Sequence, residues 1–167
     1  MFLKDRIQAD LTSSLKEKRE LELSVLRMLQ AAILNKEKEK RYKLSKEKPE
    51  LSGDDLAKES QLSDEEIIDV LSGEVKKRKE AQLLFEKGGR LDLVEKEKRE
   101  TEILNKYLPE QISEKDLRIL IKEIILKTGA KDQKDIGKVM TQLMPKIKGR
   151  VAGNEISRIV KELLQAQ

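Results

Sequence analysis

The 167-residue sequence contains no cysteine and no histidine. Without cysteine, the chain cannot form disulfide bonds, thiolate nucleophiles or the cysteine-based zinc and iron–sulfur sites. Without histidine, it lacks the side chain that most often serves as a general acid or base near neutral pH. We therefore predict no catalytic residue, no metal site and no cofactor site.

Aromatic residues, prolines and long apolar runs are also scarce. Aromatic residues make up 2% of the chain and only three prolines interrupt it, whereas charged residues reach 41%. No segment alternates apolar and polar residues for more than a few positions, as a half-buried strand does. This composition is typical of long helices with solvated faces and predicts an all-α fold.

The first residues carry charge at Lys4, Asp5 and Arg6. They leave no apolar stretch long enough for a signal peptide or a membrane span. The sequence therefore predicts a cytoplasmic protein without a membrane partner.

Apolar spacing predicts four helices in the first two thirds of the chain. The first covers residues 3–15, and the second runs from about residue 21 into the charged segment 36–41. Ser63 and Glu66 match a capping box that opens the third helix, and Gly88-Gly89 closes it. The fourth covers about 91–107. Residues 42–62 are weakly patterned and are interpreted as an insertion or connector. Whether a short helix forms around 54–59 is left undecided by the pattern.

The step Leu108-Pro109 is the clearest boundary, because proline disfavours helical geometry in the preceding residue and cannot continue the hydrogen-bond ladder. We therefore predict an N-terminal domain of long antiparallel helices, residues 1–109, and a C-terminal domain, residues 110–167. Three short apolar stripes, punctuated by Gly129, Gly149 and Gly153, predict a small three-helix bundle. A bundle of this size is expected to be marginally stable by itself.

The remaining residue types offer no recognisable catalytic arrangement. The serines lack a base and a strained glycine-flanked turn, and the carboxylate pairs lie among lysines or at helix starts. No glycine-rich phosphate-binding motif follows a predicted strand. These features argue against an enzyme that carries its own chemistry.

The net charge of +4 lies entirely in the C-terminal part of the chain. Residues 1–109 hold equal numbers of basic and acidic residues, whereas residues 110–167 hold 12 basic and 8 acidic ones. The excess concentrates between Lys131 and Arg150, where Asp132 and Asp135 are the acidic residues. Such a surface attracts phosphate backbones through counterion release. Composition alone nevertheless favours an ordinary solvated face, because the segment lacks aromatics on which bases stack.

The same segment resembles the YqeY family, whose C-terminal part is similar to the tail domain of GatB, the tRNA-binding subunit of the glutamine-dependent tRNA amidotransferase. The tail resemblance rests on residues 134–140 (KDIGKVM), on residues 143–146 (LMPK), and on Gly149, Arg150 and Gly153. Upstream, residues 23–29 with 31–33, residues 85–93 (FEKGGRLDL) and residues 107–109 (YLP) also resemble this family. The stretch 42–62 is longer than in typical members.

The resemblance implies tRNA binding without catalysis, because the amidation chemistry of GatB resides in a catalytic body and a partner amidase. Carbon–nitrogen ligase activity with glutamine as amide donor is then only a family association. A synthetase or an amidotransferase is the implied protein partner. By matched position, the implied RNA contacts are Lys134, Gly137, Lys138, Lys146, Gly149 and Arg150.

Each of these positions also has a structural explanation. Gly137 is compatible with tight helix packing, Gly149 with a helix stop, and the apolar residues between them with the core. Two other hypotheses stay open. In the first, the chain is a helical protein-interaction module that presents Leu83, Leu84 and Phe85 to a partner. In the second, which ranks last, it is an amidotransferase in its own right. The oligomeric state is not predicted.

Overall fold

A computed structural model of the chain describes residues 2–151 and 153–165. These residues form eight α-helices and one 3₁₀ turn and contain no β-strand, which confirms the predicted all-α fold. The chain separates into two compact units, unit 1 (Met1–Tyr107) and unit 2 (Leu108–Gln167). None of the described helices combines the length and the apolar character that crossing a membrane requires.

Unit 1 begins with a helical hairpin, α1 (Leu3–Lys16) and α2 (Glu20–Glu47). The turn between them places Lys18 in the left-handed region, with φ 56°. The buried residues of α2 all lie in its first half, between Val25 and Ile33. The helix continues past the predicted charged segment to Glu47, and its second half contacts α3 through Arg41 and the C-cap Lys48.

The predicted connector 42–62 is largely helical. Its first residues extend α2 to Glu47, and α3 (Gly53–Glu59) occupies the position of the possible short helix around 54–59. The Ser52 hydroxyl caps α3 by accepting a hydrogen bond of 3.2 Å from the Asp55 amide. Ser60 and Leu62, at the end of the stretch, are buried. The end of this segment therefore packs into unit 1, whereas α3 itself buries no residue.

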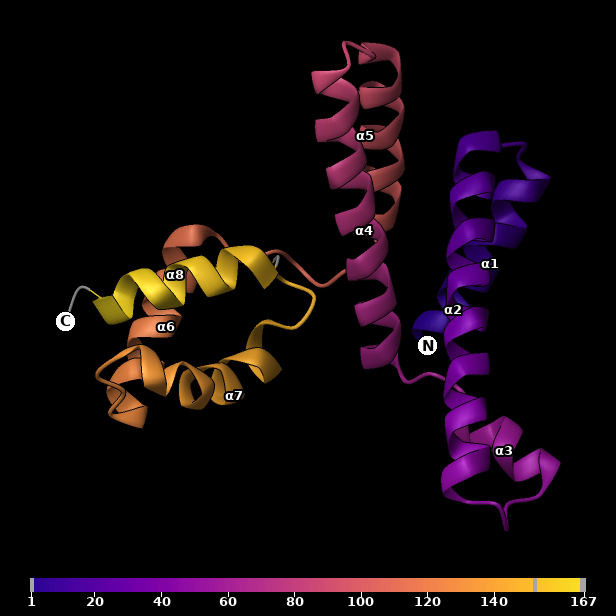
Figure 1. Ribbon diagram of the computed structural model, residues 1–167. Helices are drawn as coiled ribbons and strands as arrows, with labels where there is room; N and C mark the ends of the chain where they lie inside the picture. The colour runs from indigo at the N-terminus through magenta and orange to yellow at the C-terminus, as the bar shows by residue number, and fades with distance from the viewer. Residues whose placement is uncertain (1, 152, 166–167) are drawn as a thin grey trace. The chain divides into compact units, whose positions relative to one another are not determined.

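Unit 1 continues with a second hairpin, α4 (Asp64–Lys87) and α5 (Leu91–Asn105), whose helices run side by side (Figure 1). The predicted capping box at the start of α4 is confirmed. The Glu66 amide donates to the Ser63 hydroxyl, and the Ser63 amide donates to the Glu66 carboxylate. Gly89 adopts φ +70° in the turn between the helices, a conformation that favours glycine.

Tyr107 anchors the end of unit 1 to its first helix. The side chain is buried, and its hydroxyl donates a 2.8 Å hydrogen bond to the Asp10 carboxylate. The Arg6 guanidinium lies 5.2 Å from the ring centroid. Burial and the Asp10 carboxylate raise the pKa of the Tyr107 phenol, so the hydroxyl stays protonated and keeps donating.

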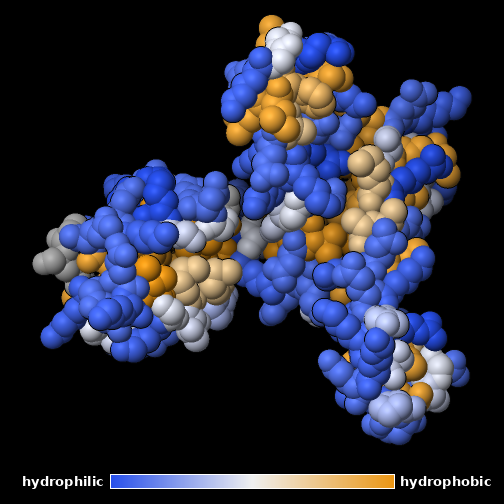
Figure 2. All heavy atoms as spheres, viewed as in Figure 1, coloured by the Kyte–Doolittle hydropathy of each residue, from blue (hydrophilic) through white to orange (hydrophobic). Residues whose placement is uncertain are grey.

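Figure 2 shows that hydrophilic side chains cover much of the surface of each unit and that apolar patches are exposed among these side chains. Several large apolar side chains are exposed in unit 1. At the α4–α5 turn, Leu83, Leu84 and Leu91 expose 58%, 68% and 70% of their surface, whereas the neighbouring Phe85 is half-buried.

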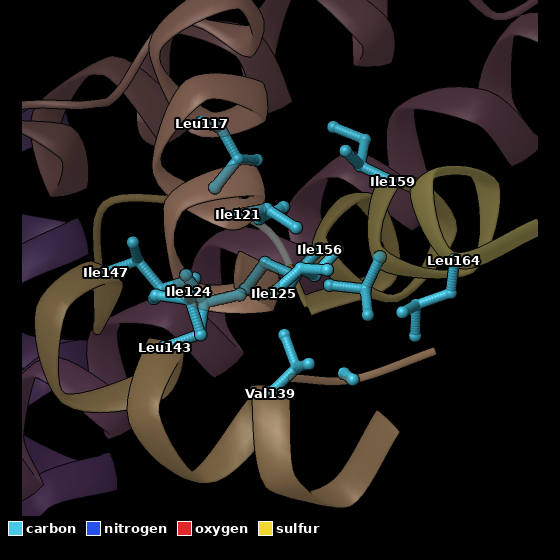
Figure 3. Close-up of a cluster of buried hydrophobic side chains, with 12 residues drawn as sticks. Leu117, Ile121, Ile124, Ile125, Val139, Leu143, Ile147, Ile156, Ile159 and Leu164 are labelled. Atoms are coloured by element: carbon cyan, nitrogen blue, oxygen red, sulfur yellow. The ribbon is translucent and has the colours of Figure 1, made fainter. Parts of the chain in front are cut away.

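Unit 2 consists of α6 (Glu114–Thr128), the 3₁₀ turn η1 (Gln133–Asp135), α7 (Ile136–Ile147) and α8 (Gly153–Gln165). Its three helices contribute branched aliphatic side chains to one buried cluster, which includes Leu117, Ile121, Val139, Leu143 and Ile159 (Figure 3). Gly129 closes α6 with φ +65°. The helix α7 includes Pro145, although proline supplies no amide donor to the helix.

Candidate nucleic-acid interface

The outer face of α7 combines positive charge with solvent-exposed backbone. Val139, Leu143 and Ile147 point into the core, so the face opposite to them is exposed. Gly137 and Lys138 lie at the start of this face. We define the α7 surface as the outer face of α7 with the exposed lysines at its two ends; its members are Lys134, Gly137, Lys138, Thr141, Pro145 and Lys146.

Two aspartates order the turn that leads into the α7 surface. Asp132 accepts a hydrogen bond of 2.7 Å from the Lys134 amide, and Asp135 accepts one of 3.1 Å from the Lys131 amide. The Lys138 ammonium also donates to Asp135, at 2.7 Å. This bond raises the pKa of Lys138, and together with the Lys131 amide it lowers the pKa of Asp135. Both side chains thus remain charged at neutral pH.

The predicted lysines differ in how far they are neutralised. Lys138 pairs with Asp135, but its side chain is largely exposed, and a pair of this kind contributes little and is screened by salt. Lys134 and Lys146 are exposed and form no ion pair among the described residues. Lys134 and Lys146 therefore carry positive charge that no described ion pair neutralises.

Gly137 has no packing role among the described residues of unit 2. A Cβ added at this position has no neighbouring atom within 4 Å, and the backbone conformation is one that any L-residue adopts. Glycine in a helix nevertheless costs roughly 0.5–1 kcal/mol relative to alanine. The suggestion that Gly137 permits tight helix packing within the chain is therefore wrong, and the residue leaves bare backbone on the α7 surface.

Gly149 and Arg150 lie in the loop after α7 and hold the linker that enters unit 2. The Gln111 side-chain amide donates to the Gly149 carbonyl at 2.9 Å, and the Arg150 Nε donates to the Glu110 carbonyl at 2.9 Å. The Ile112 amide donates to the Arg150 carbonyl at 3.0 Å. Gly149 has φ +72°, which favours glycine. The six predicted contacts thus divide into four at the α7 surface and two in this loop.

The arginines on the other two helices of unit 2 are neutralised. Arg118 of α6 pairs with Glu114 at 2.8 Å and with Glu162 of α8 at 2.7 Å. Arg158 of α8 pairs with Glu162 at 2.8 Å and with Glu114 at 3.6 Å. This four-residue network links α6 to α8. The carboxylates that it uses are unavailable to the lysines beside α7.

A buried charge cluster in unit 1 was not predicted from the sequence, in which residues 76–79 resemble a solvated run. Arg78 is only 5% exposed, and its guanidinium pairs with Glu74 at 3.1 Å and with Glu100 of α5 at 3.2 Å. Spacing offered a signal, since Arg78 follows Leu71 by seven residues and Val75 by three. It therefore falls on the apolar stripe of α4.

Within residues 2–151 and 153–165, no group of acidic side chains is arranged so that it could hold a metal ion. The arrangement in unit 2 is instead suited to electrostatic contact with an extended anion. Lysines at both ends of α7, with exposed backbone between them, form such a surface.

Comparison with known proteins assigns the chain to a family. A family model described as Yqey-like protein matches residues 4–164. The chain belongs to the YqeY family. Family membership extends across both units, so α4, α5 and the α7 surface all lie within the matched range.

One relative of this YqeY-family chain comes from Pyrenophora tritici-repentis (strain Pt-1C-BFP). It is named altered inheritance of mitochondria protein 41, mitochondrial. The two sequences are 27% identical over 167 residues, which cover 97% of this chain and 81% of the relative. The relative's name places that protein in mitochondria.

Proposed function

We propose that this YqeY-family protein is a tRNA-binding accessory protein linked to glutamine-dependent tRNA amidation, and that the α7 surface contacts the RNA. One observation carries the proposal. Lys134 and Lys146 have no ion-pair partner in the described part of the chain and flank the bare backbone of Gly137 on α7, whereas the unpaired lysines of α6 and α8, such as Lys115, Lys122 and Lys161, lie beside no such glycine. Phosphate contacts made by such lysines release counterions and favour binding without base readout.

In this proposal the chain binds and does not catalyse. The amidation chemistry belongs to a partner, an amidotransferase or an aminoacyl-tRNA synthetase, which acts on the tRNA that unit 2 holds. The protein acts in the cytoplasm. The lack of histidine and cysteine supports the proposal that the chain binds tRNA without catalysis, as does the resemblance of residues 134–150 to the GatB tail.

The first prediction concerns the three lysines of the α7 surface. We expect the variant with Lys134, Lys138 and Lys146 replaced by alanine to bind tRNA roughly tenfold or more weakly at low salt. The slope of log affinity against log salt concentration should fall by about 0.9 for each phosphate that the variant no longer neutralises. Filter binding of tRNA across a salt series measures both quantities.

A matched control removes the same charge from other helices of unit 2. Lys115, Lys122 and Lys161 are exposed on α6 and α8, and their replacement by alanine should leave the affinity close to that of the parent. The melting temperatures of both variants should equal that of the parent, because the replaced side chains are exposed. Equal loss of affinity in the two variants would reject the α7 surface, and no saturable binding by the parent would reject the function.

The second prediction separates stability from binding at one residue. Gly137→Ala should stabilise unit 2 by less than the roughly 0.5–1 kcal/mol expected in a helix interior, because Gly137 lies in the first turn of α7 and the added Cβ meets no neighbour. The same methyl group should weaken tRNA binding by obstructing approach to the backbone. Urea denaturation and filter binding measure the two effects. Gly53→Ala, in the first turn of α3, provides the control and should leave tRNA affinity unchanged.

The second candidate function is a protein-interaction module without RNA binding. The specific observation in its favour is the exposure of Leu83, Leu84 and Leu91 at the α4–α5 turn. Apolar side chains exposed together in this way often mark a contact surface for another protein. A natively folded chain that shows no saturable tRNA binding at low salt would favour this candidate over the first.

A further inference from the structure

A groove of about 880 Å³ lies within unit 1, between α2 and α4. Small and apolar side chains form its floor, and Figure 2 shows apolar surface exposed in the region between these two helices. The floor residues are Met28, Ala31, Ala32, Leu62, Val70 and Gly73. We call this feature the α2–α4 groove.

Gly73 keeps the α2–α4 groove open at the middle of α4. Its backbone is helical, and a Cβ added there has no atom within 4 Å. A glycine inside a helix lowers stability by roughly 0.5–1 kcal/mol relative to alanine. No turn, positive φ or close neighbour in the described part of unit 1 explains it. The bare position permits close approach of another backbone, as do Ala31 and Ala32 on the facing helix.

The wall formed by α2 is predominantly positive. Lys36, Lys40 and Lys43 line it, against one carboxylate, Glu39. Lys36 pairs with Glu39 at 2.9 Å on the same helix, whereas Lys43 is exposed and forms no ion pair within residues 2–151 and 153–165. This wall therefore favours acidic side chains on whatever enters the groove.

The side chains of α4 that line the groove include more carboxylates than ammonium groups, and one of these carboxylates, Glu74, pairs with Lys77 at 2.7 Å and with Arg78 at 3.1 Å. Glu66, Asp69 and Glu74 line the wall formed by α4, against one ammonium, Lys77. Glu66 bonds to Lys40 across the groove at 2.8 Å and thereby joins the two walls at one end. A nucleic acid or an anionic membrane carries negative charge along its whole length, so this wall disfavours both.

The dimensions of the α2–α4 groove match a helix of about four turns. Its lining on α2 extends from Met28 to Lys43, which corresponds to about 22 Å along the helix axis. An apolar floor between charged walls is the arrangement by which a groove receives an amphipathic helix. Opposite charge on the two walls defines the occupant further, because each edge of the helix meets a different sign.

We propose that the α2–α4 groove binds one amphipathic helix of a partner protein, with acidic residues along its edge beside α2 and basic residues along its edge beside α4. The helix presents small apolar residues to Gly73, Ala31 and Ala32. This inference is independent of RNA binding, because the groove lies in unit 1 and the α7 surface lies in unit 2. Failure of either test leaves the other unaffected.

The probe is a fluorescein-labelled synthetic helix of about 15 residues, a length that spans the groove. Three versions share one apolar stripe of alanine and leucine. One has an acidic and a basic edge, one has two acidic edges, and one has two basic edges. Fluorescence anisotropy with the full-length protein should rank the split-edge helix first. Methyl NMR signals of Met28, Ala31 and Ala32 should shift on titration with it.

Two variants test the location. Gly73→Met should weaken binding of the split-edge helix by about tenfold or more by filling the groove, while its better helix propensity keeps unit 1 at least as stable as the parent. Lys36→Glu with Lys43→Glu makes both walls acidic and should move first rank to the helix with two basic edges. Lys38→Glu with Lys79→Glu, outside the groove, changes the net charge equally and should preserve the original ranking.

Several outcomes overturn the proposal. These are no saturable binding of the split-edge helix, a ranking that the wall variant leaves unchanged, and methyl shifts confined to other parts of unit 1. A dimer in sedimentation experiments that Gly73→Met dissociates would also overturn it, by identifying the occupant as a second copy of the chain.

Discussion

Replacing Arg78 by methionine should lower the free energy of unfolding of unit 1 by about 3–5 kcal/mol, because it leaves the buried Glu100 and the partly buried Glu74 without their buried cation. The Arg78 guanidinium pairs with Glu74 and Glu100, and one of its terminal nitrogens lies 3.9 Å from the Met28 sulfur. It therefore contacts α2, α4 and α5 at once. Urea denaturation of the full chain, followed through NMR signals of unit 1, measures the change.

An exposed neighbour of the same cluster provides the control. Lys77 pairs with the same Glu74 carboxylate at 2.7 Å, but its side chain is 73% exposed. Lys77→Met should cost less than about 1 kcal/mol, since Lys77 is largely exposed and Glu74 keeps its pair with Arg78. Equal losses for Arg78→Met and Lys77→Met would show that burial does not determine the contribution of this cluster.

A double replacement tests whether the loss of stability in Arg78→Met arises from the buried Glu100 carboxylate that is left without a cation. Arg78→Met combined with Glu100→Leu removes both buried charges and should return unit 1 to within about 1–2 kcal/mol of the parent. Recovery of this size indicates that the ion pair specifies the register of α4 against α5 more than it stabilises the fold. A double variant as unstable as Arg78→Met alone would instead attribute the loss to packing.

The cluster also predicts an acid dependence. Burial raises the pKa of Glu74, but hydrogen bonds from Lys77 and Arg78 outweigh it and hold the pKa below its ordinary value of 4.5. A carboxylate with a lowered folded pKa stabilises the fold above the unfolded pKa, and this contribution disappears as the pH falls through the folded pKa. Stability of unit 1 should therefore decline below about pH 4.5, and the decline should be smaller in Arg78→Met, because Glu74 then has less favourable charge to lose.

The second large effect is expected in unit 2. Leu143 is fully buried in the three-helix cluster (Figure 3), and Leu143→Ala should cost about 2–5 kcal/mol through reduced burial and the cavity left behind. A domain of about 60 residues has little stability to spare. The substitution should therefore unfold unit 2 while unit 1 remains folded, a state that residue-resolved NMR distinguishes directly.

A neighbouring residue of α7 again provides the control. Met144 follows Leu143 directly but is 41% exposed, and Met144→Ala should change the stability of unit 2 by no more than about 0.5 kcal/mol. The tRNA affinity of Leu143→Ala should fall as unit 2 unfolds, whereas that of Met144→Ala should be retained. Comparable destabilisation by the two substitutions would contradict the assigned core.

The residues of the candidate site could largely be predicted from local sequence pattern. Their division between the α7 surface and the loop after α7 could not. The lysines and glycines of residues 134–150 stand out in the sequence by charge and spacing. Lys134, Gly137 and Lys138 gather at the start of α7 because they lie three or four residues apart along the chain, whereas Lys146 lies at the other end of the helix. Gly149 and Arg150 bond instead to residues 110–112, which lie about 40 positions earlier in the chain. Local spacing carries no information about an interaction of that range.

Local pattern was enough to predict the all-α class, the capping box at Ser63 and the apolar stripes of the tail, because these depend on interactions between residues a few positions apart. The packed helices were needed to show which charges are buried, which are neutralised and where a groove remains open. Arg78 and Lys77 are adjacent basic residues, yet one is enclosed by Glu74 and Glu100 and the other lies in water. The difference arises because burial and pairing depend on which helices pack together, and that is set by the whole core.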